Sequence, residues 1–367
     1  MRDLIVFGED FGGLPSSTQH LITHLSSERK ILWVNSIGLR KPKLTVKDVR
    51  RALNKLMPSA PSGITSRVPS HIKVVNIKTI PAPSGNAERV FAKWIMKQQL
   101  QSLIERHQLK NPIVWSSLPT TADLCGELNE YANVYYCGDD FSALAGVDHK
   151  TVAKHEQKLA QKADLVLTAS EVLRTRFTKE KTQLLKHGVS FELFNTKAKP
   201  ATDLPSTKPV VGFYGSLSEW LDYELINTVA QSMSNWDFVF IGKNELSDNP
   251  FNALDNIHLL GPKPHHELPS YVQNWTASWL PFKNNEQIRA CNPLKLLEYI
   301  TSGTPIITSS YPAVDIYSSE LNIYQSAEQI IQWLQRPSQL IAPNPEIARA
   351  HSWENKSQYL DILLEAL

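Results

Sequence analysis

The sequence is poor in cysteine, has almost no net charge and contains no long apolar run. Its three cysteines, Cys125, Cys137 and Cys291, show neither CxxC nor metal-ligand spacing, which argues against a disulfide framework and a zinc site. The 38 basic and 36 acidic residues give a net charge of +2, too little for a global attraction to nucleic acid. No apolar run approaches the roughly 18 residues that cross a bilayer, and the N-terminus lacks a signal-peptide layout. We therefore expect a cytoplasmic protein.

What the chain does have is length and a regular alternation of strands with helices. At 367 residues it exceeds the size at which one hydrophobic core stops growing, so about two domains are expected. Short apolar runs, such as LIVFG, ILWVN and IVWSS in the first half and PVVGFYG, FVFIG and PIITSS in the second, alternate with helical patterns. This alternation is typical of α/β domains built on parallel sheets.

A proline-containing segment, NTKAKPATDLPSTKP, separates the two series of strands. It has few large apolar residues and no periodicity, so we predict a linker over 196–208 between domains at 1–195 and 209–350. Residues 351–367 have helical apolar spacing and predict a final helix, packed either back on the first domain or on its own domain. Two doubly wound domains joined in this way would place a ligand cleft between the carboxyl ends of their sheets.

The segment NPLKLLEYITSGTP, residues 292–305, carries two charges on an otherwise apolar helix. Lys295 and Glu298 are one turn apart, which is compatible with a surface ion pair of a few tenths of a kcal/mol. However, Pro293 suits the first turn of a helix, and a helix N-terminus attracts phosphate. A lysine there can neutralise a diphosphate, and a carboxylate one turn later can accept hydrogen bonds from ribose hydroxyls. The pair therefore also fits a nucleotide site.

Several segments together resemble GT-B glycosyltransferases of family 4. They are, in order, VYYCGDDF, HEQKLAQKADLVLTAS, LLKHGVSFELF, GFYGSLSEW, NIHLLGPKPHHELPSYVQNWTASWLPF, NPLKLLEYITSGTP and AHSWE. The likeness is strongest to the exopolysaccharide and teichuronic-acid branch, which includes the glucuronosyltransferase of xanthan-type assembly. This resemblance implies two Rossmann-like domains facing a cleft and a nucleotide-sugar donor, usually UDP-linked, with no metal ion and no cofactor. It also implies that Lys295 contacts the donor diphosphate and Glu298 the ribose.

The sequence departs from the family pattern on the donor side. Ala290 stands where many members have a glutamate that contacts the donor sugar, and GFYGSLSEWLDYELI lacks the usual Arg and Lys. Neutralisation of the diphosphate would then depend on Lys295, backbone N–H groups and Arg289. The sugar contacts are expected from three residues of the preceding loop, Glu286, Gln287 and Asn292.

Two further segments are candidates for donor binding. In GFYGSL, Gly215 and Ser216 would let the backbone approach a phosphate, although an ordinary βα turn explains them equally well. In KHGVSFELF, His187 and Gly188 match a family segment on the floor of the cleft near the donor. A lone histidine is more often structural.

The remaining candidates belong to the acceptor side. Asp139 and Asp140 follow a predicted strand, where they fit a helix N-cap or a general base. The resemblance favours Asp140 as the base, with inversion in the glucuronosyltransferase branch and an open stereochemistry in the wider family. Their spacing is not DxD, so no metal site is predicted. The loop GEDFGGLPSSTQHL lacks GxGxxG, and its Asp10, Gly12 and Gly13 either line the acceptor side or form a plain βα connection.

Two basic amphipathic segments, 40–55 and 89–97, fit either solvated helix faces or docking onto anionic lipid. Docking would place the protein on the inner face of a membrane, near an acceptor linked to a lipid diphosphate. No nucleic-acid motif accompanies them.

The leading hypothesis is a hexosyl- or uronosyltransferase that adds a sugar to a lipid-linked or glycan acceptor in bacterial surface polysaccharide synthesis. A UDP-sugar 2-epimerase on the same fold and a non-catalytic binding subunit are the alternatives, and Ala290 lends weight to the second.

Overall fold

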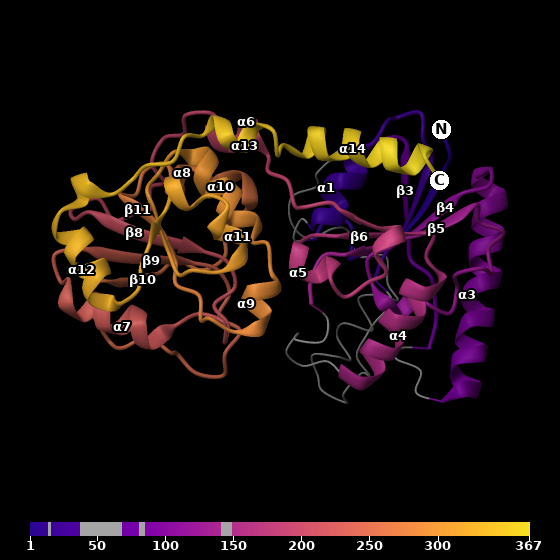
Figure 1. The fold of residues 1–367 in the computed structure, drawn as a ribbon, viewed down its shortest axis with the longest axis horizontal. Coiled ribbons are helices and arrows are strands. Elements are labelled where there is room, and N and C mark those ends of the chain that lie inside the picture. The colour runs from indigo at the N-terminus through magenta and orange to yellow at the C-terminus, as the bar shows by residue number, and fades with distance from the viewer. Residues whose placement is uncertain (14–15, 37–67, 81–84, 141–148) are drawn as a thin grey trace. The chain divides into compact units, whose positions relative to one another are not determined.

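The computed structural model describes residues 1–13, 16–36, 68–80, 85–140 and 149–367 (Figure 1). The described chain forms two compact units. Unit 1 comprises residues 1–186 with 356–367, and unit 2 comprises residues 187–355. The predicted basic segment 40–55 lies outside the described residues.

Unit 1 is built on a parallel seven-stranded sheet of order β3-β2-β1-β4-β5-β6-β7. Its strands are β1 (Leu4–Phe7), β2 (Ile31–Val34), β3 (Ile72–Val75), β4 (Ile113–Ser116), β5 (Ala132–Cys137), β6 (Leu165–Thr168) and β7 (Thr182–Leu184). The strands β1, β2, β4, β5 and β6 are buried along their whole length. This burial explains why they are continuous apolar runs in the sequence rather than alternating ones.

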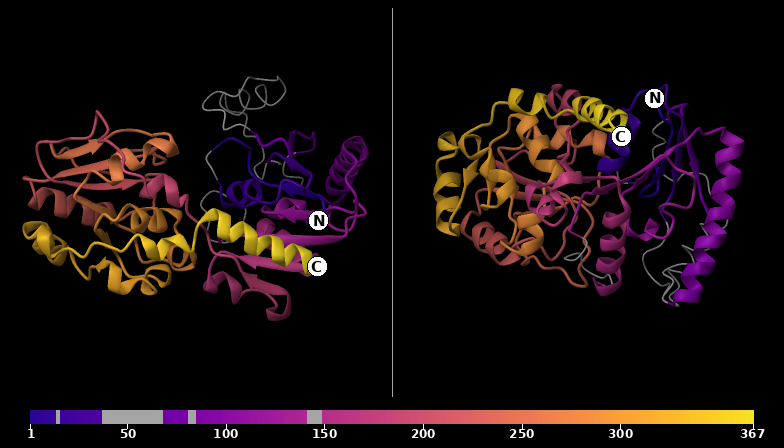
Figure 2. Two further views of the ribbon diagram at one scale, coloured as in Figure 1. Left: turned by 90° about the horizontal axis from the view of Figure 1, so that it is seen from above. Right: turned by 45° about the vertical axis from the view of Figure 1, so that its right-hand side comes forward.

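The helices of unit 1 are α1 (Ser17–Thr23), α3 (Asn86–His107), α4 (His149–Lys162), α5 (Glu171–Arg174) and most of α14 (Trp353–Glu365). The C-terminal helix α14 lies beside α1 (Figure 2), where Ser357 Oγ donates to the Leu21 carbonyl at 2.8 Å. Closer to the C-terminal end of α14, the buried Arg29 guanidinium donates to Asp361 at 2.8 Å and to Glu365 at 2.5 Å. The predicted return of the last helix to the N-terminal domain is confirmed.

Unit 2 has a parallel six-stranded sheet of order β10-β9-β8-β11-β12-β13. Its strands are β8 (Val210–Tyr214), β9 (Asp237–Ile241), β10 (Ile257–Leu259), β11 (Ala277–Leu280), β12 (Ile306–Thr308) and β13 (Asn322–Ile323). Helices α7 (Tyr223–Ser232) and α12 (Ala327–Gln335) cover one face, and α8 (Pro269–Val272) and α10 (Leu294–Ser302) the other (Figure 1). The other α-helices described in unit 2 are α6 (Phe191–Asn195), α9 (Glu286–Ala290), α11 (Pro312–Asp315) and α13 (Glu346–Arg349). The predicted doubly wound α/β architecture is therefore present in both units.

The predicted linker, 196–208, belongs to unit 2 in the structure. Ala201 and Leu204 pack against the core of unit 2, and the Ala201 N–H donates to the Ser270 carbonyl at 3.0 Å. Asp203 accepts hydrogen bonds from Lys263 at 2.5 Å and from the Tyr271 hydroxyl at 2.6 Å. The prolines exclude regular structure from this segment but leave its few apolar side chains able to pack. The chain instead passes between the units after Lys186 and again after Asn355.

Candidate functional site

In unit 2, the carboxyl ends of β8 and β11 meet at the point where the strand order reverses direction. Ligands of open parallel sheets bind at such a switch point, because the loops that follow the two strands diverge there. The loop after β8 begins with Gly215. The first turn of α10 brings Lys295 to the same place.

The Lys295 ammonium lies over two aromatic rings. Its Nζ is 5.5 Å from the ring centroid of Phe213 in β8 and 5.7 Å from that of Phe282, just beyond β11. The side chain also contacts Gly215, where an added Cβ would lie 3.0 Å from Nζ. The two aromatic rings and the Gly215 backbone thus position the Lys295 cation at the switch point.

The charge of Lys295 is only weakly compensated. Within the described part of the chain, no ion pair or hydrogen bond joins its half-buried ammonium to another residue. Burial lowers the pKa of Lys295, and the Glu298 charge offsets this effect in part. A partly desolvated cation without an anionic partner is costly, so the arrangement is suited to an external anion.

Two glycines shape the backbone beside Lys295. Gly215 has φ +139°, and its N–H donates to the Ile241 carbonyl at 2.8 Å. Gly242, which follows β9, has φ +155°, and a Cβ there would lie 1.9 Å from the Gly215 carbonyl oxygen. The half-buried Ser216 makes no hydrogen bond to another described residue, which leaves its N–H and hydroxyl available to a ligand. Sequence reasoning identified Gly215 and Ser216 but missed Gly242, whose only signal is its place at a strand end.

Glu298 is buried one turn after Lys295, and both of its oxygens have partners. The Tyr214 hydroxyl donates to Oε2 at 2.5 Å, and His265 Nε2 lies 2.6 Å from Oε1. Burial opposes ionisation of the carboxyl, but these two hydrogen bonds and the charges of His265 and Lys295 outweigh it and lower the pKa of Glu298. The ionised carboxylate retains lone pairs for a further donor, such as a ribose hydroxyl.

His265 is a residue of this site that sequence reasoning missed. It begins the 3₁₀ turn η3 (His265–Glu267), and the Phe194 ring packs against its imidazole at 5.4 Å between centroids. Burial would lower the pKa of His265, but the hydrogen bond and charge of Glu298 raise it above its usual value. The sequence HHELP shows two histidines near a helix start, and nothing in it distinguishes the residue that reaches Glu298.

The loop residues expected to contact the donor sugar lie around α9. Glu286 and Arg289 are exposed, Gln287 and Asn292 are half-buried, and Ala290 is buried. The Arg289 Nε donates to Asn284 at 2.7 Å, and Asn285 caps the helix by accepting from the Ile288 N–H. The Arg289 side chain is thus held by its own loop.

His187 and Gly188 begin unit 2 and pack next to the end of that unit. A Cβ on Gly188 would lie 2.7 Å from the Trp353 ring, and the Val189 N–H donates to the His351 carbonyl at 2.9 Å. His187 is buried. These contacts give Gly188 a packing role, in which only glycine lets the tryptophan approach the backbone.

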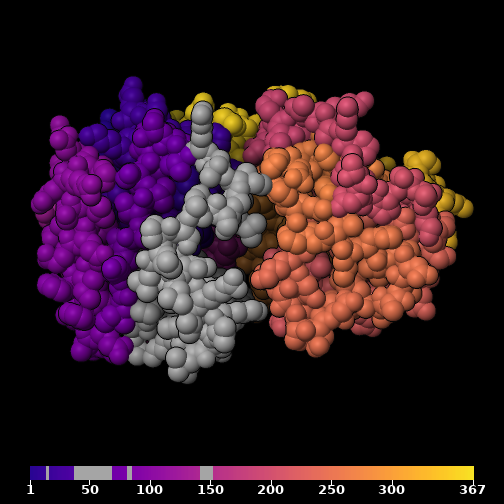
Figure 3. Space-filling model, turned by 180° about the vertical axis from the view of Figure 1, so that it is seen from behind, coloured from indigo at the N-terminus to yellow at the C-terminus, as the bar shows by residue number. Residues whose placement is uncertain are grey.

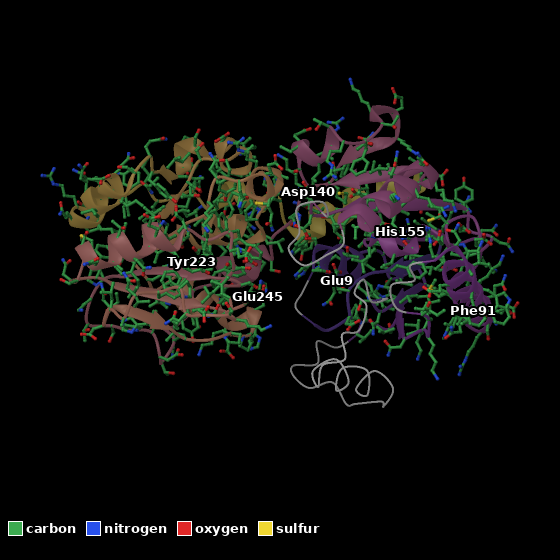
Figure 4. All side chains as sticks on the ribbon, turned by 90° about the horizontal axis from the view of Figure 1, so that it is seen from below. Glu9, Phe91, Asp140, His155, Tyr223 and Glu245 are labelled. Carbon is green, nitrogen blue, oxygen red and sulfur yellow. The ribbon has the colours of Figure 1, made fainter. Side chains whose placement is uncertain are left out.

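In unit 1, Asp140 belongs to a network that reaches the core. Arg176 donates to Asp140 Oδ1 at 2.5 Å and to Glu156 Oε2 at 3.2 Å. Glu156 is buried and accepts from the Tyr135 hydroxyl at 2.7 Å. Asp140 is half-buried at the carboxyl edge of the sheet (Figure 4), whereas Asp139 is exposed. Of the two, Asp140 is therefore the aspartate with a fixed position.

The loop after β1 lies at the same carboxyl edge of the sheet. Asp10 Oδ1 accepts from both the N–H and the hydroxyl of Ser36, at 3.0 and 2.8 Å. Gly12 has φ +80°, and the Gly13 N–H donates to the Asp10 carbonyl at 3.1 Å, which closes a turn. These residues organise the loop, and Asp10 joins it to the segment that follows β2.

The basic residues of segment 89–97 are paired within unit 1. Arg89 binds Asp123 at 2.8 Å, and Lys93 and Lys97 bind Glu127 at 2.6 and 3.0 Å. The exposed side chains of this part of α3 are instead Val90, Phe91 and Trp94. Helix α3 forms one edge of unit 1 (Figure 3), and Phe91 lies on it (Figure 4).

No group of three or more His, Cys, Asp or Glu side chains in the described ranges is arranged to hold a metal ion. None of the helices in these ranges combines the length and the apolar character that crossing a bilayer requires.

Comparison with known proteins agrees with this geometry. Residues 194–335 match the family described as Glycosyl transferases group 1. The putative teichuronic acid biosynthesis glycosyltransferase TuaH of Bacillus subtilis (strain 168) is 26% identical over 201 residues, covering 49% of this chain and 51% of TuaH. The match thus spans about half the length of that curated relative.

Two solved structures share the fold over the whole chain. HepE of Anabaena in complex with UDP and glucose superposes with a TM-score of 0.70 at 13% identity, covering 100% of both chains. An E. coli structure described as trehalose-6-phosphate bound with UDP-2-fluoro glucose has a TM-score of 0.67 at 10% identity, covering 100% of this chain and 99% of that one. Residues 194–335 of this chain are thus similar to the group 1 glycosyltransferases, and the shared architecture shows that the chain has the GT-B fold.

Proposed function

We propose that this protein transfers a sugar from a nucleotide-diphosphate donor, with UDP as the nucleotide, to a lipid-linked or glycan acceptor. The observation that carries the proposal is the Lys295 ammonium, half-buried at the switch point of unit 2 without an ion pair in the described chain. The donor diphosphate is the anion this position suits. Glu298 is one helical turn away, in position for the ribose.

Both the site and the structural neighbours support UDP as the donor nucleotide. HepE and the E. coli protein are described with UDP or a UDP-sugar, and their fold is the one found here. Neutralisation of the leaving diphosphate by Lys295, the Ser216 N–H and the N-terminus of α10 requires no metal ion. The donor sugar, a hexose or a uronic acid, would contact the loop that contains Glu286, Gln287 and Asn292.

The acceptor side is assigned to unit 1. Asp140 would accept the proton of the attacking hydroxyl, and Arg176 holds the carboxylate in one position. Asp10, Gly12 and Gly13 belong to the loop after β1, at the same carboxyl edge of the sheet. The similarity to TuaH favours an acceptor in bacterial surface polysaccharide synthesis.

Contact with a membrane surface would serve a lipid-linked acceptor. Because Arg89, Lys93 and Lys97 are paired with acidic residues, this contact would depend on Val90, Phe91 and Trp94 rather than on charge. Trp94 and Phe91 stack at 5.9 Å between centroids, and exposed aromatic side chains suit the interfacial layer of a bilayer.

The substitution Lys295→Met tests the proposed function. It removes the charge while keeping the apolar stem between the Phe213 and Phe282 rings. UDP-glucose binding, measured by calorimetry, should weaken at least about tenfold, whereas thermal stability should stay the same or rise because an uncompensated cation is lost. Lys199→Ala, at an exposed position of the same unit, is the control. Wild-type affinity in the Lys295→Met variant would refute the donor site.

A second assay separates the alternatives. Incubation with nucleotide sugars and a total lipid extract should release UDP and yield a heavier lipid. Interconversion of the sugar would indicate an epimerase, and binding without turnover would indicate a non-catalytic subunit.

A further inference from the structure

The donor site of unit 2 contains a carboxylate next to the place assigned to a diphosphate. Lys295 contributes one positive charge, and the ionised Glu298 contributes one negative charge a single helical turn away. With these two groups alone the site would be neutral, although the donor diphosphate brings two negative charges. A group that compensates the charge of Glu298 would leave the charge of Lys295 to the diphosphate.

His265 is placed to do so. Its Nε2 lies 2.6 Å from Glu298 Oε1, and because a carboxylate only accepts hydrogen bonds, this nitrogen carries a hydrogen. The Phe194 ring packs on the imidazole at an interplanar angle of 63°, which restricts its rotation. The other oxygen of Glu298 accepts from the neutral Tyr214 hydroxyl, which orients the carboxylate without adding charge.

The other described charged side chains near His265 are exposed or pair with residues other than Glu298. His266 and Glu267, on the same turn, lie 3.9 Å apart and are exposed. Lys263, on the preceding loop, pairs with Asp203 at 2.5 Å. From β8 and α10, the groups that act on Glu298 are Tyr214 and Lys295. Of the described cations around Glu298, His265 is the one in direct contact with it.

We infer that His265 is a positioning residue of the donor site, whose imidazolium neutralises Glu298 so that the charge of Lys295 remains available to the donor diphosphate. This inference rests on the proposed function. It explains how one site accommodates both a carboxylate for ribose and a binding position for a dianion. The raised pKa of His265 agrees with it, since the imidazolium then persists above pH 6.5.

The test is the pH dependence of UDP-glucose binding to the full chain between pH 6 and pH 9. UDP-glucose is the suitable probe because its diphosphate is a diester, whereas the terminal phosphate of UDP would titrate near pH 6. Wild-type affinity should fall by about tenfold over this range, the change that accompanies a shift of about one pKa unit in one group. Uridine, which has the same titratable uracil N–H but no phosphate, should weaken much less over the same range.

His265→Gln is the informative variant, since glutamine keeps an N–H donor but carries no charge. Its affinity for UDP-glucose should be about tenfold below wild type at pH 6 and equal to it at pH 9. His266→Gln, one residue away and exposed, should retain the wild-type profile.

Each remaining outcome has a definite meaning. If the His265→Gln variant keeps the wild-type slope, titration of Lys295 accounts for the pH dependence and the inference about His265 is wrong. If wild-type affinity does not change between pH 6 and pH 9, the inference is also wrong, while the proposed function stands. Absence of UDP-glucose binding at every pH would overturn both.

Discussion

The ammonium of Lys295 lies against the backbone of Gly215, so closely that a Cβ on this glycine would be 3.0 Å from both Nζ and Cε. The relationship joins two segments that are eighty residues apart in the sequence, the exit of β8 and the first turn of α10. Position 215 therefore favours glycine for two reasons, its φ of +139° and this close contact. The position of the Lys295 ammonium therefore depends on the absence of a side chain at Gly215.

Gly215→Ala should affect both stability and binding. The backbone conformation is strained for alanine, which should lower the free energy of unfolding by about 1–3 kcal/mol. The new methyl group should also displace the Lys295 ammonium and weaken UDP-glucose binding by at least about tenfold. Urea denaturation and calorimetry measure the two effects.

Gly126→Ala is the matched control for this substitution. Gly126 has φ +87°, but nothing lies within 4 Å of an added Cβ. It should cost about 1–2 kcal/mol of stability and leave nucleotide affinity unchanged. Equal affinities for wild type and the Gly215→Ala variant would show that the contact with Lys295 is unimportant.

Asp140→Asn should reduce sugar transfer without weakening the binding of donor. If Asp140 is the general base, turnover should fall by about 10²- to 10⁴-fold, since the amide cannot accept the proton. UDP release in the presence of acceptor measures turnover, and calorimetry measures donor affinity. Asp139→Asn should have a much smaller effect because Asp140 is the residue bound by Arg176. A larger loss in the Asp139→Asn variant would reverse this assignment.

Asp361→Ala should loosen the C-terminal helix. Arg29 is fully buried and would lose its Nε partner while keeping Glu365 and the Arg2 carbonyl. We expect a loss of about 3 kcal/mol, the lower end of the range for a broken buried pair, and faster amide exchange in α14. The double change Arg29→Met with Asp361→Leu should be less destabilising, because no buried charge is left unpaired. A double variant as unstable as the single one would contradict this account of the pair.

The pair of His265 and Glu298 should make stability depend on pH in two directions. The folded-state pKa of Glu298 lies below 4.5, so its contribution is present above that pH and is lost as the pH falls through the folded value. The folded-state pKa of His265 lies above 6.5, so its contribution is complete below that pH and is lost as the pH rises through the folded value. The pair therefore stabilises the protein most between about pH 4.5 and 6.5.

Difference curves isolate this contribution from the other titrating groups. Subtracting the urea midpoints of the Glu298→Gln variant from those of wild type should show both limbs, and His265→Gln should remove the alkaline limb. Parallel pH profiles for wild type and both variants would contradict the coupling.

Patterns within single segments predicted much of the fold. Continuous apolar runs indicated buried parallel strands, and helical spacing indicated α10 and α14, because each pattern depends on periodicity along the chain itself. The boundary between units is different. The prolines of 196–208 suggested a linker, but Ala201, Asp203 and Leu204 find partners in unit 2 that are distant in sequence.

Local sequence patterns likewise did not predict which residues pair with the charged side chains. Segment 89–97 is basic by composition, yet its cations bind Asp123 and Glu127. A helical pattern shows which residues share a face, but it does not show which acidic side chains a neighbouring element presents to that face.

The sequence by itself determined that Lys295 and Glu298 lie one turn apart on a helix, because that spacing is a property of the helix. Only the tertiary structure decided their environments. The crossing of β8, η3 and α10 places Phe213 and Gly215 under the lysine, and Tyr214 and His265 on the glutamate. These contacts join segments tens of residues apart, and the resulting burial and hydrogen bonds, rather than the helix, set the pKa and the available charge of each group.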